Sequence, residues 1–401
     1  MLCSVALIFL AGLAAGAVFQ IMKLPRVIGM LGAGIVVGPF VLGLLDDKVL
    51  SISAELRQTA LIIILLKAGL SLDISDLKKV GRSAVLMSFL PACCEILGYV
   101  IFAPYLLGTS RIDSAVMGAV LSAVSPAVVV PRMVALIEKK RGTDKGIPQM
   151  ILAGASCDDV FVIVLFSTFL TMAQGGGAKL SGLLDIPVSI VLGLLLGTAA
   201  GMAVYILFEY SYSHGKKIRS SIKVIVLLSA AFLLMTAETA AKPYVALSGL
   251  LAVVAMACVL KLKSEKTVTE RLSEKFGKLW IAAEVILFVL VGAAVDIRYT
   301  LSAGAAAAAM ILIALLFRAV GVVICMAGTE LNFRERLFCV IAYLPKATVQ
   351  AAIGSVPLAA GLPCGKTILS VAVLGIILTA PLGAIGIDCT CEKLLEDNSN
   401  S

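Results

Sequence analysis

Charge is scarce in this chain of 401 residues: only 14% are Asp, Glu, Lys or Arg, whereas 60% are hydrophobic. Ordinary soluble globular proteins have about 25% charged residues, so that class is excluded. His214 is the only histidine, so no histidine-based metal cluster or catalytic constellation is predicted. The ten cysteines include no Cys-x-x-Cys pair, which argues against a zinc site or a disulfide framework. No glycine-rich phosphate loop is present, and we expect no cofactor.

Long apolar runs fill almost the whole chain. Each is roughly 18 to 25 residues long, the length that crosses a bilayer as an α-helix. We therefore predict an all-α polytopic membrane protein with about thirteen transmembrane helices. The predicted spans are 2–22, 27–45, 57–72, 80–106, 113–137, 148–173, 186–209, 220–240, 244–261, 278–296, 301–327, 335–360 and 366–388.

Lys and Arg are distributed unevenly between the predicted spans, and most of them fall in the odd-numbered loops. Because cytoplasmic loops carry the positive excess, the N-terminus is predicted outside and the C-terminus in the cytoplasm. We expect an integral protein of the plasma (inner) membrane that contacts its lipids. The net charge of +8 is then a topology signal, and no nucleic-acid partner is predicted.

The sequence contains an internal repeat. The third predicted span ends with a Gly-x-x-x-Asp-Ile pattern at Gly69 and Asp73, and the tenth ends with the same pattern at Gly292 and Asp296. An offset of seven spans means that the two copies enter the membrane from opposite sides. Inverted repeats of this kind are typical of secondary transporters.

Prolines fall at matching places in the two repeats. Pro126 and Pro131 lie in the fifth span, and Pro345 and Pro357 lie in the twelfth. Each proline removes a backbone hydrogen bond in mid-membrane. The prolines predict two broken, crossing helices whose half-helix ends meet at the midplane, where such transporters bind ions.

Five ionisable residues lie well inside predicted spans, where charge is costly and is usually functional. Glu95 and Arg318 occupy equivalent repeat positions with opposite charge, which predicts a buried structural ion pair. Asp158 and Asp159 are adjacent, so desolvation and mutual repulsion both favour their protonated forms, while Lys346 opposes this effect. Carboxylates in such a setting bind either a proton or a small cation, and competition between the two amounts to exchange.

Four strings of the sequence carry a family resemblance. They are VLSAVSPAVVVP (with Ser125 and Pro126), CDD (Asp158 and Asp159), LPKATVQAAIGSV (with Lys346, Thr348 and Gln350) and, near the N-terminus, LPRVIGMLGAGIVVGP. Together they resemble the NHA branch of the monovalent cation:proton antiporters. The resemblance extends from about residue 20 to residue 385. It implies a sodium (or lithium)/proton antiporter of the NhaA-type fold, a homodimer that works by an elevator movement, and a transporter rather than an enzyme.

Carried over position by position, the resemblance makes Asp159 the principal ion and proton carrier and Asp158 its partner. It implies that Glu95 and Arg318 form the structural pair and that Lys346 balances charge at the crossover. Two further residues, Ser125 and Thr348, are expected to offer oxygen ligands to the cation. The implied division of the chain is 1–79 and 220–300 for dimerisation, 80–173 and 301–388 for the ion-translocating core, 174–219 for a linker helix, and 389–401 for a cytoplasmic tail.

Three rival functions remain open. A potassium/proton antiporter shares every physical argument above. A sodium-coupled symporter of an organic anion is related in fold, although the Asp158–Asp159 pair repels an anion. An intramembrane aspartyl protease needs its two aspartates on separate helices.

The stoichiometry of exchange is open too. Bacterial electrogenic relatives have Lys where Arg318 stands, and arginine does not release a proton. Exchange is one for one if Asp158 stays salt-bridged to Lys346, and one cation replaces two protons if both aspartates titrate.

Overall fold

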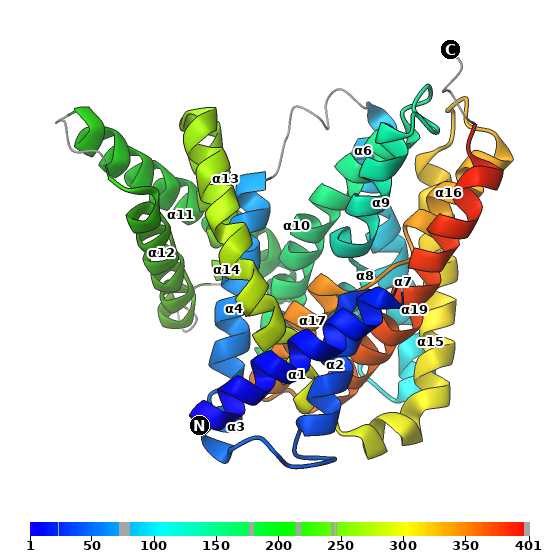
Figure 1. Ribbon diagram of the computed structural model, residues 1–401, viewed down its shortest axis with the longest axis horizontal. Coiled ribbons are helices and arrows are strands. Elements are labelled where there is room, and N and C mark those ends of the chain that lie inside the picture. The colour runs from blue at the N-terminus through cyan, green and yellow to red at the C-terminus, as the bar shows by residue number, and fades with distance from the viewer. Residues whose placement is uncertain are drawn as a thin grey trace. The chain divides into compact units, whose positions relative to one another are not determined.

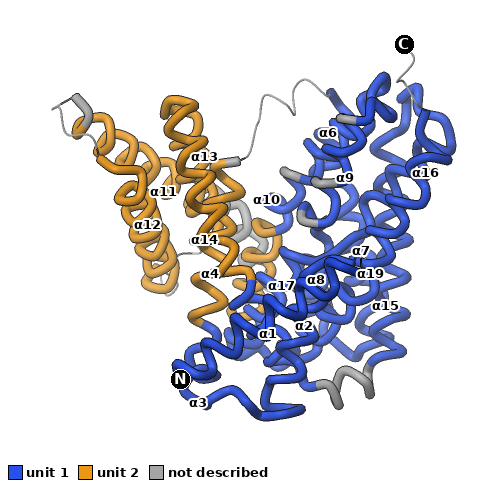
Figure 2. The backbone as a smooth tube through the Cα atoms, in the orientation of Figure 1, with its two compact units in different colours: residues 1–54, 73–162, 285–401 blue, residues 55–72, 163–284 orange. Residues whose placement is uncertain are grey.

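The computed structural model describes residues 1–22, 24–71, 81–175, 180–213, 218–241, 245 and 247–396. Every regular element in these ranges is an α-helix, which confirms the predicted all-α class (Figure 1). The chain divides into two compact units, residues 1–54, 73–162 and 285–401 in one and residues 55–72 and 163–284 in the other (Figure 2). The division into dimerisation and core domains stays a prediction.

The first unit contains the helices that carry the ionisable residues singled out above. It consists of α1 (Leu2–Ile21), α2 (Arg26–Val37), α3 (Asp47–Ser51), α6 (Arg82–Met87), α7 (Leu90–Leu107), α8 (Arg111–Ser122), α9 (Pro126–Glu138), α15 (Ile297–Cys325), α16 (Phe333–Ala342), α17 (Thr348–Gly354), α18 (Val356–Ala359) and α19 (Gly365–Leu394), with the first half of α10 (Ile147–Gln174) and the end of α14 (Lys266–Ala293).

The second unit contains most of α4 (Ser53–Ser71), α11 (Leu180–Ser213), α12 (Ser220–Ala241) and α13 (Gly249–Lys263), with the remaining parts of α10 and α14. Helix α11 packs along α13. A Cβ atom at Gly197 would overlap the carbonyl oxygen of Ala252. Glycine at this position therefore lets the two backbones touch, which is how helices associate in lipid without a hydrophobic driving force.

Eight of the described helices are long and apolar enough to cross a membrane. They are Leu2–Ile21, Arg82–Leu107, Ile147–Gln174, Val191–Ser211, Ser220–Ala241, Lys266–Ala293, Gly304–Cys325 and Gly365–Leu394. The other predicted spans correspond to α2, α4, α13 and two interrupted helices. The count of thirteen spans stays a prediction, and Asp73 of the repeat pattern lies outside the described residues.

The fifth predicted span is interrupted between α8 and α9. Helix α8 begins at Arg111 and ends at Ser122. Ser110 caps its N-terminus, because the Ser110 hydroxyl accepts a hydrogen bond from the amide of Asp113 at 3.1 Å. Helix α9 begins at Pro126, because a proline at the first helical position loses no hydrogen bond. The predicted break at Pro131 is wrong, because α9 continues through it to Glu138. A single proline within a helix removes one hydrogen bond and need not end the helix.

The twelfth predicted span is interrupted twice. Helix α16 starts at a capping box formed by Asn332 and Glu335 and ends at Ala342, and α17 starts only at Thr348. Pro345 lies in the unwound segment between them, and Pro357 lies in the first turn of the short helix α18. The unwound segments of the two spans touch directly, because the amide of Ser125 donates to the carbonyl of Pro345 at 2.8 Å.

Candidate functional site

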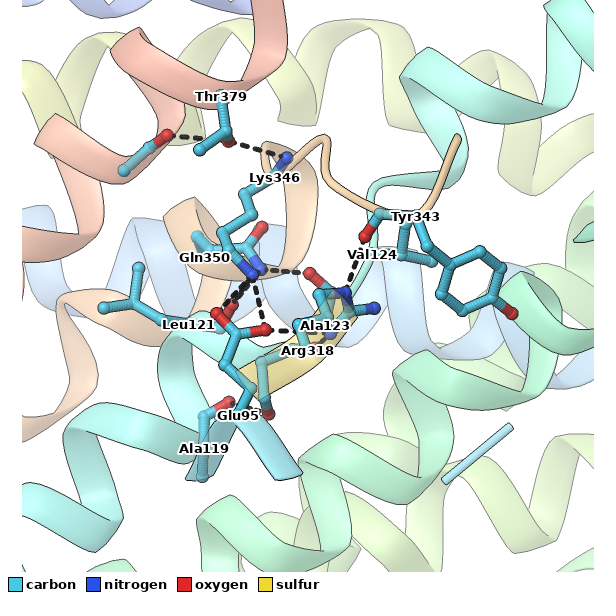
Figure 3. A network of polar contacts seen from close by, with 12 residues as sticks. Glu95, Ala119, Leu121, Ala123, Val124, Arg318, Tyr343, Lys346, Gln350 and Thr379 are labelled. Atoms are coloured by element: carbon cyan, nitrogen blue, oxygen red, sulfur yellow. Dashed lines mark hydrogen bonds and ion pairs between the residues drawn. The ribbon is translucent and has the colours of Figure 1, made fainter. Parts of the chain in front are cut away.

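Buried charge is concentrated where the two unwound segments meet. The side chains of Glu95 on α7, Asp158 on α10, Arg318 on α15 and Lys346 between α16 and α17 are all fully buried. Figure 3 shows Glu95, Arg318 and Lys346 converging below the unwound segment that carries Lys346. The structure thus brings together residues that are separated by more than 250 positions in the chain (Glu95 and Lys346 by 251). All of them belong to the first unit.

Glu95 is the hub of this network. Its Oε2 accepts hydrogen bonds from Arg318 Nη1 at 2.9 Å and from Lys346 Nζ at 2.8 Å, and Lys346 Nζ also lies 2.7 Å from Oε1. The predicted Glu95–Arg318 ion pair is therefore present as a contact, and Lys346 joins it. A buried carboxylate that accepts from two cations is compensated for its loss of hydration.

Arg318 connects Glu95 to the aspartate pair. Its Nε donates to the carbonyl of Tyr343 at 2.5 Å, Nη1 also donates to the carbonyl of Ser122, and Nη2 donates to Asp158 Oδ2 at 3.3 Å. The guanidinium group also lies 5.4 Å from the centre of the Tyr343 ring. Every nitrogen of this buried guanidinium therefore has an acceptor, which is what its burial requires.

Asp158 is bound differently from the expectation. Its Oδ2 accepts from the backbone amide of Val124 at 2.7 Å as well as from Arg318. The ion pair considered above between Asp158 and Lys346 is absent from the described contacts, since Lys346 Nζ donates to Glu95 and to the carbonyl of Leu121 at 2.5 Å. The physical reason is that Glu95 is the carboxylate within reach of both cations, whereas Asp158 is reached by Arg318 alone.

Several buried oxygen atoms of this region have no hydrogen-bond partner in the described part of the chain. They include Asp158 Oδ1, Asp159 Oδ1, Ser125 Oγ and Gln350 Oε1. Asp159 is partly buried, whereas Ser125 and Gln350 are fully buried. Buried polar atoms are normally paired, so an unpaired group of oxygens calls for an explanation such as an ion. Carboxylate, hydroxyl and amide oxygens are the ligands that hard cations prefer.

Comparison with known proteins agrees with this chemistry. Residues 5–393 match the family described as "Sodium/hydrogen exchanger, transmembrane". The sodium/hydrogen exchanger 9B2 of Xenopus tropicalis is 33% identical over 98% of this chain and 75% of its own length, and the human exchanger 9B2 is 33% identical over 93% and 70%. The chain belongs to the sodium/hydrogen exchanger family.

The fold of this chain is similar to that of a solved antiporter. The sodium proton antiporter MjNhaP1 of Methanocaldococcus jannaschii, solved at pH 8, superposes with a TM-score of 0.77 over 97% of both chains, with 21% identical residues. Together with the apolar helices, family membership makes the chain an integral membrane protein.

Side chains from other segments cap the C-terminal end of α8. The carbonyl of Leu121 accepts from Lys346 and from Gln350 Nε2 at 3.4 Å, that of Ser122 accepts from Arg318, and that of Ala123 accepts from Gln350 Nε2 at 2.7 Å. A broken helix leaves such carbonyls without intrahelical partners, and a buried end must find substitutes. Figure 3 shows Gln350 between Lys346 and Ala123.

Sequence reasoning named Gln350 as a motif residue but gave it no role in the site, and it missed Tyr343. A signal for Gln350 existed, because it is an uncharged polar residue in the middle of the predicted span 335–360. Thr348, expected as an oxygen ligand, is buried at the start of α17. The backbone amide of Lys346 is held by Thr379 Oγ1 at 3.0 Å, so α19 also positions the unwound segment.

Proposed function

We propose that this protein exchanges sodium (or lithium) ions for protons across the membrane. The cation and the proton compete for Asp159, with Asp158 as its partner. The proposal draws on membership of the sodium/hydrogen exchanger family and on the solved antiporter of similar fold. The transported ions are the only small partners that it requires, and no bond is made or broken.

The charge balance of the site carries the proposal. When all five groups are ionised, the three carboxylates Glu95, Asp158 and Asp159 exceed the two cations Arg318 and Lys346 by a single negative charge. Glu95 takes up both cations, and Arg318 also neutralises Asp158, which leaves Asp159 without a basic partner among the described contacts. A carboxylate in a water-poor site has to be neutralised by a proton or by a cation.

The stoichiometry follows from the same balance. Because Arg318 stays charged and holds Asp158, a single monovalent ion restores neutrality at Asp159. We therefore propose one-for-one, electroneutral exchange. Unpaired oxygens of Asp158, Ser125 and Gln350 are available to coordinate the dehydrated cation, and Thr348 is a further candidate ligand.

The transport cycle is alternating access. Sodium displaces the proton from Asp159 on the cytoplasmic side, the ion-translocating core moves by an elevator motion within a homodimer, and an external proton displaces the sodium. This cycle assumes the orientation expected from the loop charges, with the C-terminus in the cytoplasm of a cell bounded by the plasma membrane.

The test is proton flux in liposomes that contain the purified protein and an internal pH dye. Sodium, lithium and potassium gradients are applied in turn, with and without a potassium/valinomycin clamp. We expect sodium- or lithium-driven flux that is insensitive to the clamp in the wild type and lost in Asp159→Asn. Asp47→Asn, which removes an exposed carboxylate on α3, is the matched control and keeps full activity.

Each alternative gives a different result. Flux driven by potassium but not by sodium identifies a potassium/proton antiporter. Full flux in Asp159→Asn contradicts the assignment of the carrier. Clamp-sensitive flux in the wild type contradicts one-for-one exchange.

A further inference from the structure

Tyr343 is a fully buried residue at the end of α16 that the transport cycle above does not use. It touches Arg318 in two ways. Its carbonyl accepts from Arg318 Nε at 2.5 Å, and its ring lies 5.4 Å from the guanidinium carbon. A guanidinium over an aromatic face is stabilised by the ring quadrupole, most strongly where water is excluded.

The same side chain reaches the helix that carries both aspartates. A Cβ atom at Gly154 on α10 would overlap the Tyr343 hydroxyl, so the ring is wedged between Arg318 and α10. Gly154 precedes Asp158 by four residues and therefore lies on the same face of α10. Figure 3 shows the ring pointing away from Glu95 and Lys346.

The contact with α10 is one of packing. The Tyr343 hydroxyl has no hydrogen-bond partner in the described ranges. The ring itself belongs to an apolar cluster that includes Met87, Ala155 and Phe338. The ring, rather than the hydroxyl, therefore fills the space beside Arg318.

The bond between Arg318 and Asp158 is the weakest polar contact of the guanidinium network described above. At 3.3 Å it is the longest of the polar contacts of Arg318, whose other acceptors lie at 2.9 Å or less. Removing the ring takes away its contact with the guanidinium and leaves space beside it, so Arg318 is expected to shift toward that space and to lose its longest contact, the one with Asp158, first. Asp158 then becomes a second carboxylate that needs a proton.

We propose that Tyr343 is a positioning residue whose ring holds Arg318 against Asp158 and thereby confines exchange to a single proton at Asp159. The inference rests on the proposed function, because it specifies how that function is kept electroneutral. Removing the ring is expected to convert the protein into an exchanger of two protons per cation.

The experiment compares Tyr343→Leu, Tyr343→Phe and Phe338→Leu with the wild type in the liposome assay. Phe338 is a fully buried residue of α16 in the same apolar cluster and has no described contact with Arg318, so it controls for the loss of a core ring. Tyr343→Met is a second ringless variant for the case that Tyr343→Leu does not purify as a folded protein.

Two readouts separate positioning from general loosening of the core. Competition with a single proton changes the apparent KM for sodium by about tenfold per pH unit on the acidic side, and competition with two protons changes it by about a hundredfold. We expect the steeper dependence, and flux that the valinomycin clamp alters, in the ringless Tyr343 variants alone. Tyr343→Phe and Phe338→Leu are expected to keep the wild-type slope.

Three results would overturn the inference: electroneutral flux with the wild-type slope in both ringless variants, the same steepening in Phe338→Leu, or steepening in Tyr343→Phe. A lack of sodium-driven flux in the wild type is a different result, because it contradicts the proposed function and not the role of Tyr343.

Discussion

Replacing Glu95 with glutamine is expected to destabilise the protein strongly while changing very little of its shape. Glutamine keeps the size of the side chain but removes the negative charge that binds Arg318 at 2.9 Å and Lys346 at 2.7 and 2.8 Å. Both cations would stay fully buried, and the amide NH2 of glutamine, a donor, would face one of these cations, which are also donors. Lys346 would then have no carboxylate within bonding distance among its described contacts.

The size of the effect follows from the burial of the pair. Leaving a buried charge without its partner costs about 3–5 kcal/mol. With an unfolding entropy of about 2.1 cal/mol/K per residue, a chain of 401 residues loses about 4–6 °C in its thermal midpoint. The measurement is a thermal-shift or size-exclusion melting curve of the detergent-purified protein.

A control variant and a double variant make the result specific. Glu274→Gln breaks an exposed pair with Lys278 at 2.7 Å and is expected to leave the midpoint unchanged, because exposed ion pairs contribute little. Glu95→Gln combined with Lys346→Met removes the stranded cation, so part of the lost stability should return. A midpoint for Glu95→Gln within 1 °C of wild type, or a strictly additive double variant, would refute the reasoning.

Two further predictions concern the site and the loop before α10. Ser125→Ala removes a hydroxyl that has no described partner. The melting midpoint should therefore stay constant, while the apparent KM for sodium in the flux assay rises about tenfold. The control is Ser122→Ala, which removes a hydroxyl that bonds within α8 at 3.2 Å and should leave the KM unchanged. The hydrogen bond with Glu335 raises the pKa of Lys145, which lies in the loop before α10. That pair therefore stabilises the fold below about pH 10.4, the ordinary lysine pKa, and its contribution is lost as the pH rises through the higher folded-state pKa. Lys145→Gln should melt below the wild type from about pH 7 to 9, and the gap should narrow as the pH rises past the ordinary lysine pKa. A gap that does not narrow at high pH would assign the effect to something other than this charge.

Local sequence features predicted the helices and their interruptions well. Apolar runs of membrane-spanning length had to become helices, because a helix satisfies its backbone groups within the segment. Prolines marked the interruptions before Pro126 and around Pro345, since a missing amide proton acts on the turn that contains it. The same rule overestimated Pro131, which α9 accommodates.

The pairing of buried charges was predicted only in part. Repeat symmetry pointed to Glu95 and Arg318, because two residues of opposite sign stood at equivalent positions. Nothing in the sequence indicated that Lys346 joins Glu95 while Arg318 reaches Asp158. Partners in three dimensions depend on which side chains share a dielectric environment and a distance of about 3 Å, and neither quantity is a property of sequence spacing.

The sequence by itself determined that this protein lies in a membrane and that it is helical, and it singled out the buried carboxylates Asp158 and Asp159 on which the proposed exchange rests. The effects of hydrophobicity, proline and charge on helix formation and membrane insertion are confined to a single turn or span, so each can be recognised from residues that are neighbours in the sequence. Only the tertiary structure decided that Gln350 caps the carbonyls of α8 and that Tyr343 fills the space between Arg318 and α10. Those roles arise where segments distant in the chain meet, because an unpaired carbonyl or a gap beside a guanidinium exists only after the helices have packed.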